Sequence, residues 1–300
     1  MDCFFISAAK GVGRDLELDA FSGASQRSET AQGWVRLWAE SCEGFGVLLV
    51  EPKPWDSEHL SVSTGSLLLA TTANDPRHRK HIASTLLRAF LSRRCNYKYL
   101  VTRIPCEDVP LLHALEENDF RVVVPMVTLG RDYLERSRVE LPPEVEISAV
   151  RPDDIEALSS VSARAFQWGR FSADLRLSHE AAAKVHATWA RNCALGTHAA
   201  RTLVARKGGE LLGFIAVKFF FLSNQQIGSI ELIATSPSAR CSGIGRALVR
   251  SGCNWIKEST PHVVVRTELP NIPALRMYEA EGFRVLNGSI YLSLWQAHRD

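Results

Sequence analysis

The stretch Ile230–Leu248, with the sequence IELIATSPSARCSGIGRAL, decides how the rest of the chain is interpreted. Its apolar first part predicts a buried strand, and the apolar spacing after Gly243 predicts a helix. Glycine at positions 243 and 245 removes the Cβ atoms that would keep a ligand away from the backbone. The turn amides and the positive end of the helix therefore predict an anion site, with a plain strand-to-helix turn as the alternative.

The residues after this stretch make the pattern specific. The loop alone fits neither common nucleotide fingerprint, because no Lys-Ser/Thr pair and no third glycine follow it. Val263–Thr267 predicts another buried strand, and then come Asn271, Ala274, Tyr278 and Gly282-Phe283. R-x-x-G-x-G followed by N-x-x-A-x-x-x-Y-x-x-x-G-F resembles the GNAT superfamily of N-acetyltransferases. The resemblance covers Glu144–Trp295, the size of one domain.

Length and composition set the limits for the rest of the analysis. The 300 residues allow two ordinary domains, and a net charge of +2 gives no electrostatic case for nucleic acid. No apolar run reaches the roughly 20 residues of a membrane span, and the start of the chain lacks the pattern of a secretory signal. Seven cysteines include no CxxC pair and no zinc spacing. We therefore expect a cytoplasmic protein without a metal, a membrane contact or a nucleic-acid partner.

The segment Leu67–Phe120 is a weaker copy of Ile230–Phe283. Leu69-Ala70-Thr71 matches Ile233-Ala234-Thr235 at a separation of 164 residues (235 − 71), and Phe120 matches Phe283. Such self-similarity predicts two copies of one supersecondary unit, and chance similarity of apolar segments is the alternative.

The first copy lacks the residues on which the chemistry depends. Lys80 and Ile82 align with the two glycines, Asp108 aligns with Asn271, and Leu115 aligns with Tyr278. Side chains in place of the glycines would keep a pyrophosphate from the backbone. We therefore expect the first half to extend the sheet and to form one wall of the acceptor cleft, without binding a cofactor.

These patterns predict an α/β protein with a tandem GNAT-like fold, in which helices flank a mixed, mostly antiparallel sheet. The predicted domains are a degenerate GNAT-like domain over residues 1–138, a polar linker over 139–144 and a catalytic domain over 145–300. Ser22–Gly33 is rich in Ser, Gly, Gln and Thr and predicts a loop. A strand, two helices and two strands joined at Lys207–Glu210 precede the decisive stretch, which is the GNAT order.

The resemblance implies acetyl-CoA as the co-substrate. Its pyrophosphate would lie on main-chain amides of Cys241–Ala247, and the backbone at the end of the preceding strand would face the thioester carbonyl. Asn271 matches a CoA-contacting residue of the family, although a helix N-cap explains the same residue type. The predicted cofactor-binding residues are Leu232, Ile233, Ala234, Arg240, Cys241, Ser242, Gly243, Ile244, Gly245, Arg246, Ala247, Asn271 and Ala274.

Two residues are candidates for proton transfer. Tyr278 matches the family's tyrosine and would protonate the leaving thiolate, whereas a packed core aromatic is the alternative. Glu231 lies on the predicted strand before the loop and would accept the amine proton through water. A solvated strand residue without a catalytic role is the alternative.

The resemblance is greatest to dTDP-fucosamine acetyltransferases, a branch of the family with a truncated first half. Pro54–Glu58 contains that branch's W-D/E-S signature without its usual aromatic-glycine continuation. Gly169-Arg170-Phe171 and Trp189–Asn192 match its acceptor segment. Trp168, Arg170 and Phe171 are therefore the predicted acceptor residues, and Arg170 would hold a diphosphate by paired hydrogen bonds unless it is an exposed loop residue.

The sequence thus predicts an acetyl-CoA-dependent N-acetyltransferase that acts on a small-molecule amine, with a nucleotide-linked amino sugar as the first choice. A protein N-terminus, a polyamine or an antibiotic amine is the second. A non-catalytic acetyl-CoA-binding regulator is the third, and the retained tyrosine and glycines disfavour it. We expect a monomer or a homodimer.

Overall fold

The computed structural model describes residues 35–41, 44–92, 96–132 and 138–296. The predicted loop at Ser22–Gly33 lies outside these residues. The chain folds into two compact units. The first unit takes its described residues from Met1–Lys53, Thr64–Phe120 and Leu294–Asp300, and the second consists of Pro54–Ser63 and Arg121–Ser293.

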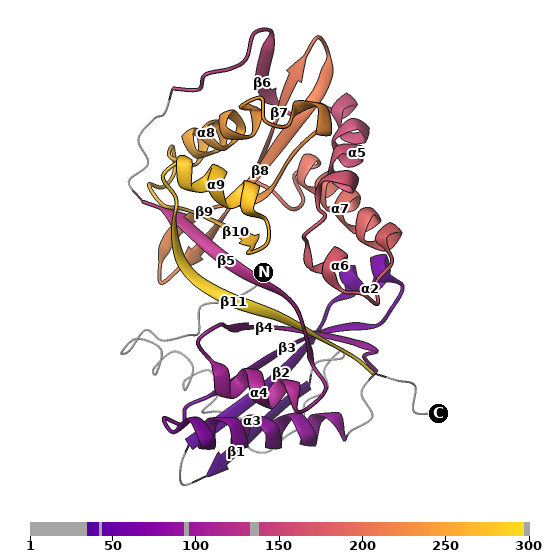
Figure 1. Ribbon diagram of the computed structural model, residues 1–300, viewed down its shortest axis with the longest axis vertical. Helices are drawn as coiled ribbons and strands as arrows, with labels where there is room; N and C mark the ends of the chain where they lie inside the picture. Colours follow the sequence, from indigo (N-terminus) through magenta and orange to yellow (C-terminus); the bar gives the residue numbers. More distant parts are fainter. Residues whose placement is uncertain (1–34, 42–43, 93–95, 133–137, 297–300) are drawn as a thin grey trace. The chain divides into compact units, whose positions relative to one another are not determined.

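The first unit contains a sheet of strands in the order β1-β2-β3-β4 (Figure 1). Strands β1, β2 and β3 are antiparallel, whereas β3 and β4 are parallel, and helix α3 packs against β1–β3. Leu87 and Phe90 of α3 are fully buried together with Leu48 and Leu67 of the sheet, so the helix encloses the core of this unit. The elements are β1 (Val35–Ser41), β2 (Gly44–Pro52), β3 (Thr64–Thr71), α3 (Pro76–Leu91), β4 (Tyr99–Pro105) and α4 (Val109–Glu116).

The second unit has the strand order β11-β5-β10-β9-β8-β7-β6, in which only the pair β9–β10 is parallel among those described. Its strands are β5 (Arg121–Arg131), β6 (Val145–Ala149), β7 (Arg201–Lys207), β8 (Glu210–Leu222), β9 (Gln225–Thr235), β10 (Val263–Glu268) and β11 (Arg284–Trp295). Its helices are α2 (Pro54–Leu60), α5 (Ile155–Ala165), α6 (Arg170–Ala173), α7 (His179–Ala194), α8 (Ile244–Ile256) and α9 (Ile272–Ala280). Short 3-10 turns at Pro152–Asp154 and Pro237–Ala239 complete it.

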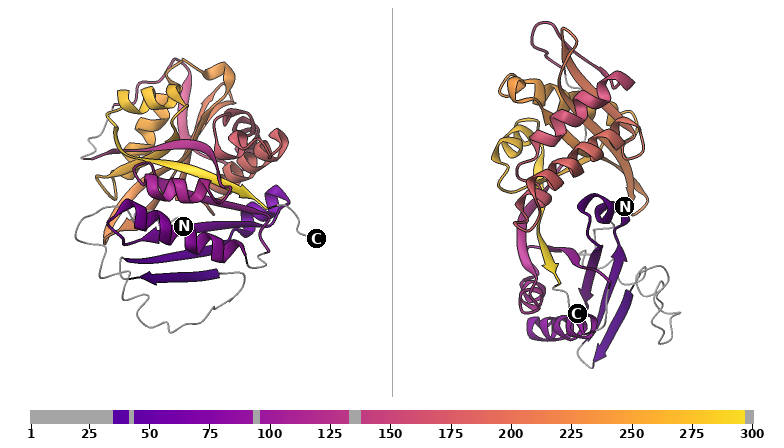
Figure 2. Two further views of the ribbon diagram at one scale, coloured as in Figure 1. Left: turned by 60° about the horizontal axis from the view of Figure 1, so that its bottom comes forward. Right: turned by 90° about the vertical axis from the view of Figure 1, so that its right-hand side faces the viewer.

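Helices cover both faces of this sheet (Figure 2). Leu158 of α5 and Ala190 of α7 pack with Phe214 on one face, and Leu248 of α8 and Tyr278 of α9 belong to the core on the other face. Alternation along the strands sends neighbouring side chains into the two cores. The α/β class and the mixed, mostly antiparallel sheet predicted from the sequence are confirmed.

The predicted repeat is also confirmed. Both halves contain strand, helix, strand, helix and strand in this order, as β3-α3-β4-α4-β5 and β9-α8-β10-α9-β11. Thr64 pairs with Tyr99 as Gly228 pairs with Val263, and both residues of the second pair lie 164 positions further along (228 − 64 and 263 − 99). Two copies of one supersecondary unit therefore share the same parallel register.

Two segments that precede residue 138 belong to the second unit. Strand β5 pairs with β10 and β11, so it completes the sheet of the second unit. Helix α2, which contains the W-D-S signature, packs against α7. The compact units therefore differ from the predicted domains, because α2 and β5 come from the first part of the chain but belong to the second unit. The domain boundary at 138–145 stays a prediction. Within the described ranges, no helix has the length and apolar character needed to cross a bilayer.

Candidate active site

The two parallel strands of the second unit separate at their carboxyl ends. β9 pairs with β10 only where Gly228–Ile230 faces Val263–Val265, although β9 continues to Thr235 and β10 to Glu268. Beyond this point β9 remains paired with β8, and β10 remains paired with β5. Main-chain groups of residues 231–235 on the side of β9 away from β8 therefore have no described strand partner. They are available to polarise a carbonyl group placed between the strands.

A β-bulge lies at the point of separation. Ala216 pairs with Leu232 and Val217 pairs with Ile230, which leaves Glu231 as the extra residue. The Glu231 carboxylate forms an ion pair with Lys218 Nζ at 2.6 Å, and its side chain is 16% exposed. The predicted base thus lies next to the separated strands, but a cation already pairs with it. The further predicted contacts on β9 split between the two faces, since Leu232 and Ala234 are buried in one core and Ile233 packs against the other.

The loop before α8 has the backbone form of an anion site. Cys241 has φ +59° and Gly243 has φ +84°, so left-handed residues interrupt the chain just before the helix. No side chain caps α8, and Ser242 Oγ instead donates to the Ala239 carbonyl at 2.6 Å. Amides in such a turn and at an uncapped helix N-terminus point toward a bound anion. This geometry fits a pyrophosphate.

The two glycines of the loop serve different purposes. A Cβ at Gly243 would meet no atom within 4 Å, and the left-handed backbone is what favours glycine there. A Cβ at Gly245 would lie 3.0 Å from Met277 Sδ. The structure therefore assigns Gly243 to the left-handed turn and Gly245 to the close approach of α9 to α8, and the expectation that both glycines make room for a ligand stays a prediction.

The remaining predicted residues of this region lie around the same helix. Arg246 Nε donates to the Glu281 carboxylate at 2.6 Å, and Ile244 and Ala247 are buried. Asn271 Oδ1 accepts from the Ala274 amide at 3.4 Å, so it is the N-cap of α9, which was the alternative interpretation. Both roles of Asn271 remain compatible, because among the described residues its Nδ2 contacts only the Thr267 hydroxyl, at 3.4 Å.

Tyr278 is buried, with 2% of its surface exposed, and its ring centroid lies 5.4 Å from that of Phe283. Burial raises the pKa of its phenol well above the usual value, and the charges of Cys253 and Glu268 raise it further. The phenol therefore keeps its proton over the whole neutral range. This is required of a proton donor, and a packed aromatic would show the same burial, so the catalytic assignment stays a prediction.

The acceptor segment predicted around Arg170 forms a network with two distant segments of the second unit. Arg170 Nη2 lies 3.4 Å from Asp56 Oδ2 of α2, and Nη1 donates to the Tyr291 hydroxyl of β11. The guanidinium carbon lies 4.3 Å from the centroid of the Phe171 ring. Arg170 is thus neither an isolated loop residue nor a cation without partners. Its predicted diphosphate contact would have to share the guanidinium with Asp56.

Buried aromatic rings support this segment. His186 stacks on Phe166 with ring centroids 4.7 Å apart and meets the edge of Phe171 at 5.9 Å. Its Nδ1 lies 2.8 Å from the Ala182 carbonyl, and burial lowers the pKa of the imidazole to about 4. His186 is therefore neutral at neutral pH, and its contacts with the two phenylalanine rings hold the acceptor segment in place. Phe171 is only 2% exposed, whereas Trp168 is 47% exposed and available to a ligand.

Sequence reasoning missed Glu268, which ends β10 where the strands separate. A Cβ at Gly169 would lie 3.8 Å from Glu268 Oε1 and 3.1 Å from His186 Nε2, so the carboxylate adjoins the acceptor segment. Burial raises its pKa, although its own amide, the Thr267 hydroxyl and the charge of Arg170 act in the opposite direction. The available signal was an acid at the end of a strand that begins with three valines.

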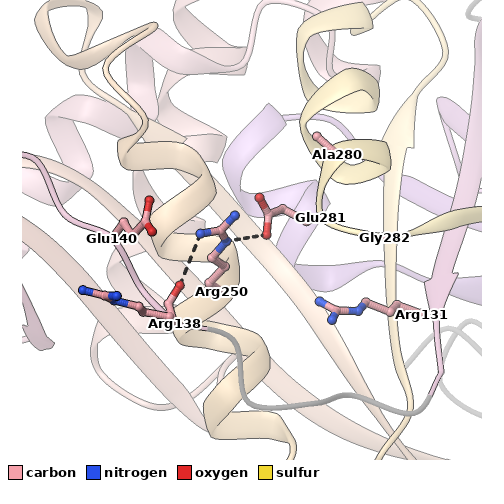
Figure 3. Close-up of a pocket in the computed structure, with 7 residues that line it drawn as sticks. All are labelled: Arg131, Arg138, Glu140, Arg250, Ala280, Glu281 and Gly282. Carbon is pink, nitrogen blue, oxygen red and sulfur yellow. Dashed lines mark hydrogen bonds and ion pairs between the residues drawn. The ribbon is translucent and has the colours of Figure 1, made fainter.

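A cavity of about 500 Å³ lies elsewhere in the second unit, near the C-terminal end of α9 (Figure 3). Arg250 lies between the Glu281 carboxylate and the Arg138 carbonyl there, with distances of 2.7 and 3.2 Å. The cavity contains none of the predicted site residues. Its lining comprises Arg131, Arg138, Glu140, Arg250, Ala280, Glu281 and Gly282.

Comparison with known proteins identifies the class. Residues 162–283 match the acetyltransferase (GNAT) family. A tandem GNAT protein from the clavulanic acid biosynthesis pathway superposes with a TM-score of 0.53 at 12% identity, over 90% of this chain and 85% of that one, which shows the shared fold. Residues 162–283 are thus a domain of the GNAT family, and the chain is an acyltransferase.

Two named proteins are similar to this chain in sequence. The spore coat polysaccharide biosynthesis protein SpsD of Bacillus subtilis is 27% identical over 259 residues, which are 83% of this chain and 84% of that protein. Mycothiol acetyltransferase of Acidothermus cellulolyticus is 30% identical over 94 residues, covering 27% of this chain and 29% of that protein. The similarity to SpsD thus extends along most of both chains.

Proposed function

We propose that this protein transfers an acetyl group from acetyl-CoA to the primary amine of a nucleotide-linked amino sugar. The observation that carries the proposal is the uncapped start of α8 behind the left-handed residues Cys241 and Gly243, which suits a pyrophosphate. The choice of a sugar is supported by similarity along most of the chain to SpsD, whose name refers to polysaccharide biosynthesis. The W-D-S signature and the segment at Arg170 support the dTDP-sugar branch.

Acetyl-CoA supplies an activated acetyl group, and the residues of this chain orient and polarise it. Amides of residues 241–247 hold the pyrophosphate, and main-chain groups of β9 beyond the bulge face the carbonyl oxygen as charge develops on it. The amine nitrogen forms a bond to the carbonyl carbon, and the carbon–sulfur bond breaks. Tyr278, protonated at neutral pH, donates a proton toward the departing thiolate.

The acceptor approaches from the side of α6 and α7. Exposed Trp168 offers a face on which a sugar or a base can stack, and the Arg170 guanidinium presents its positive charge to a diphosphate. Asp56 and Tyr291 hold that guanidinium in a fixed orientation. Phe171 supports the arrangement from the core.

The test measures release of free thiol from acetyl-CoA with a panel of amines that includes dTDP-4-amino sugars, a polyamine and a peptide N-terminus. We expect the highest kcat/KM with a dTDP-4-amino sugar. Turnover of the peptide or the polyamine alone would move the acceptor to another class. Tight acetyl-CoA binding without turnover of any amine would favour a regulator.

Replacing Tyr278 by Phe tests the acid. We expect kcat to fall about 100-fold, because one proton-transfer group is lost. The Kd for acetyl-CoA, measured by calorimetry, should change by less than about threefold, since the phenol acts on the transition state. An unchanged kcat would assign Tyr278 to core packing alone.

A further inference from the structure

The acetyl transfer needs a group that takes a proton from the attacking amine, and the structure offers two carboxylates near the separated strands. Glu231 is the extra residue of the β9 bulge, and Lys218 Nζ lies 2.6 Å from its carboxylate. An attacking amine would have to share this carboxylate with the Lys218 ammonium. Glu231 is therefore less available to the amine than a carboxylate that faces the acceptor segment.

Glu268, in contrast to Glu231, faces the acceptor segment. It is the last residue of β10, beyond the final residue that pairs with β9, and its side chain is partly exposed. Its Oε1 approaches the backbone of Gly169, which is the residue before α6 and the acceptor segment. The carboxylate thus lies between the end of the parallel strands, where the thioester is expected, and the residues expected to hold the acceptor.

The charged and titratable groups around Glu268 suit a proton acceptor. Arg170 at the start of α6 and Tyr278 on α9 both interact with its charge. His186 on α7 is neutral above about pH 5, because burial lowers its pKa to about 4. Arg170 is shared with Asp56, so its charge does not belong to Glu268 alone. Burial raises the pKa of Glu268 and makes its carboxylate more basic than a solvated one.

We propose, on the basis of the function inferred above, that the Glu268 carboxylate is the general base of the acetyl transfer. The amine nitrogen forms the C–N bond while its proton passes to a Glu268 oxygen, directly or through one water. The C–S bond breaks, and the thiolate takes a proton from Tyr278. Tyr278 then regains a proton from Glu268 or from solvent, so that amine and acetyl-CoA give amide and free thiol with no proton gained or lost.

The experiment uses the full-length chain with acetyl-CoA and the best amine from the panel. Glu268→Gln keeps the size of the side chain, and we expect kcat to fall about 100-fold with an unchanged Kd for acetyl-CoA. Glu268→Ala should lose activity to a similar extent and regain part of it on addition of formate, which supplies a carboxylate in the vacated space. Glu279→Gln, on the exposed surface of α9, is the matched control and should keep wild-type kcat.

The outcomes separate the two proposals. If wild type turns over an amine and Glu268→Gln keeps its kcat within about twofold, the base assignment is wrong and the acetyltransferase stands. A loss in Glu268→Ala that formate does not restore assigns a structural role to Glu268 and also overturns the base. A loss confined to Glu231→Gln moves the base to Glu231. Absence of turnover in wild type, with acetyl-CoA bound, overturns the acetyltransferase and the base together.

Discussion

The β3–α3 loop of the first unit and the β9–α8 loop of the second lie at equivalent points of one repeated fold, but they differ in length and in how the first amides of the following helix are capped. Residues 72–75 join β3 to α3, whereas residues 236–243 join β9 to α8, so α3 begins earlier. Asp75 Oδ1 accepts from the amides of Arg77 and His78 at 2.7 and 3.3 Å. In the first unit a carboxylate of the chain occupies the position that a bound anion would take in the second.

Ion pairs reinforce this difference. Arg79 pairs with Asp108, and Lys80 pairs with Glu117 at 2.5 Å, so the first two turns of α3 are linked to both ends of α4. In the second unit Arg246 and Arg250 of α8 pair with Glu281 at the end of α9. The described residues contain no counterpart of the Arg79–Asp108 pair, since Ser242 and Asn271 bond within their own segments. The loop before α8 thus corresponds to a helical turn with internal partners in the first unit, while the two copies keep the same strand register.

The largest effect is expected from Gly243→Val. A β-branched residue at φ +84° forces the loop to change, which displaces the amides from the pyrophosphate. We expect the Kd for acetyl-CoA to rise by about 100-fold or more, equivalent to about 2.7 kcal/mol. Gly196→Val is the matched control, because Gly196 has φ +79° and open space around it but lies after α7. Equal loss of affinity in both variants would refute the anion site.

Exchanging the residue types of the aligned pair Asn271 and Asp108 is expected to change the Kd for acetyl-CoA less than Gly243→Val does. Asn271→Asp keeps an N-cap of equal quality but loses the amide donor, so the Kd for acetyl-CoA should rise roughly tenfold with little change in stability. Asp108→Asn in the first unit breaks the ion pair with Arg79 and should cost about 1 kcal/mol of stability without any effect on affinity. If Asn271→Asp binds acetyl-CoA as wild type does, Asn271 is a cap and nothing more.

The smallest effect concerns Asp75. The Arg77 amide holds the pKa of this carboxyl below its usual value of 3.8, so its contribution to stability is present above that pH and is lost as pH falls through the lowered value. Asp75→Ala should therefore lower the unfolding midpoint slightly at pH 7, and the difference from wild type should shrink toward pH 2. The same difference at both pH values would mean that the capping charge is not what matters.

The sequence predicted the order of elements well, because apolar periodicity and the positions of Gly and Pro are local signals. Gly282 ends α9 with φ +84°, and Ser178 caps α7, as such residues commonly do. Lys80, which aligns with Gly243 in the sequence, lies within α3 and not in a loop before it. Asp75-Pro76 is a strong helix start, and it brings Lys80 into the helix.

The acceptor side was less predictable, because it depends on contacts between residues far apart in the chain. Asp56 and Arg170 are separated by 114 positions, and no local pattern connects them. Glu268 gave only the weak signal of an acid at the end of a strand. The short helix α6 was also missed, since four residues are too few to show periodicity.

Helix α2 and strand β5 precede residue 138 in the chain but belong to the second unit. A gene fragment that starts at codon 145 would encode every predicted acetyl-CoA contact, yet it would omit the strand between β10 and β11 and the aspartate that orients Arg170. The two halves therefore cannot be cut apart, recombined or inherited separately without loss of part of the enzyme. The first half, which lacks the predicted acetyl-CoA contacts, thus supplies structural elements on which the second unit depends.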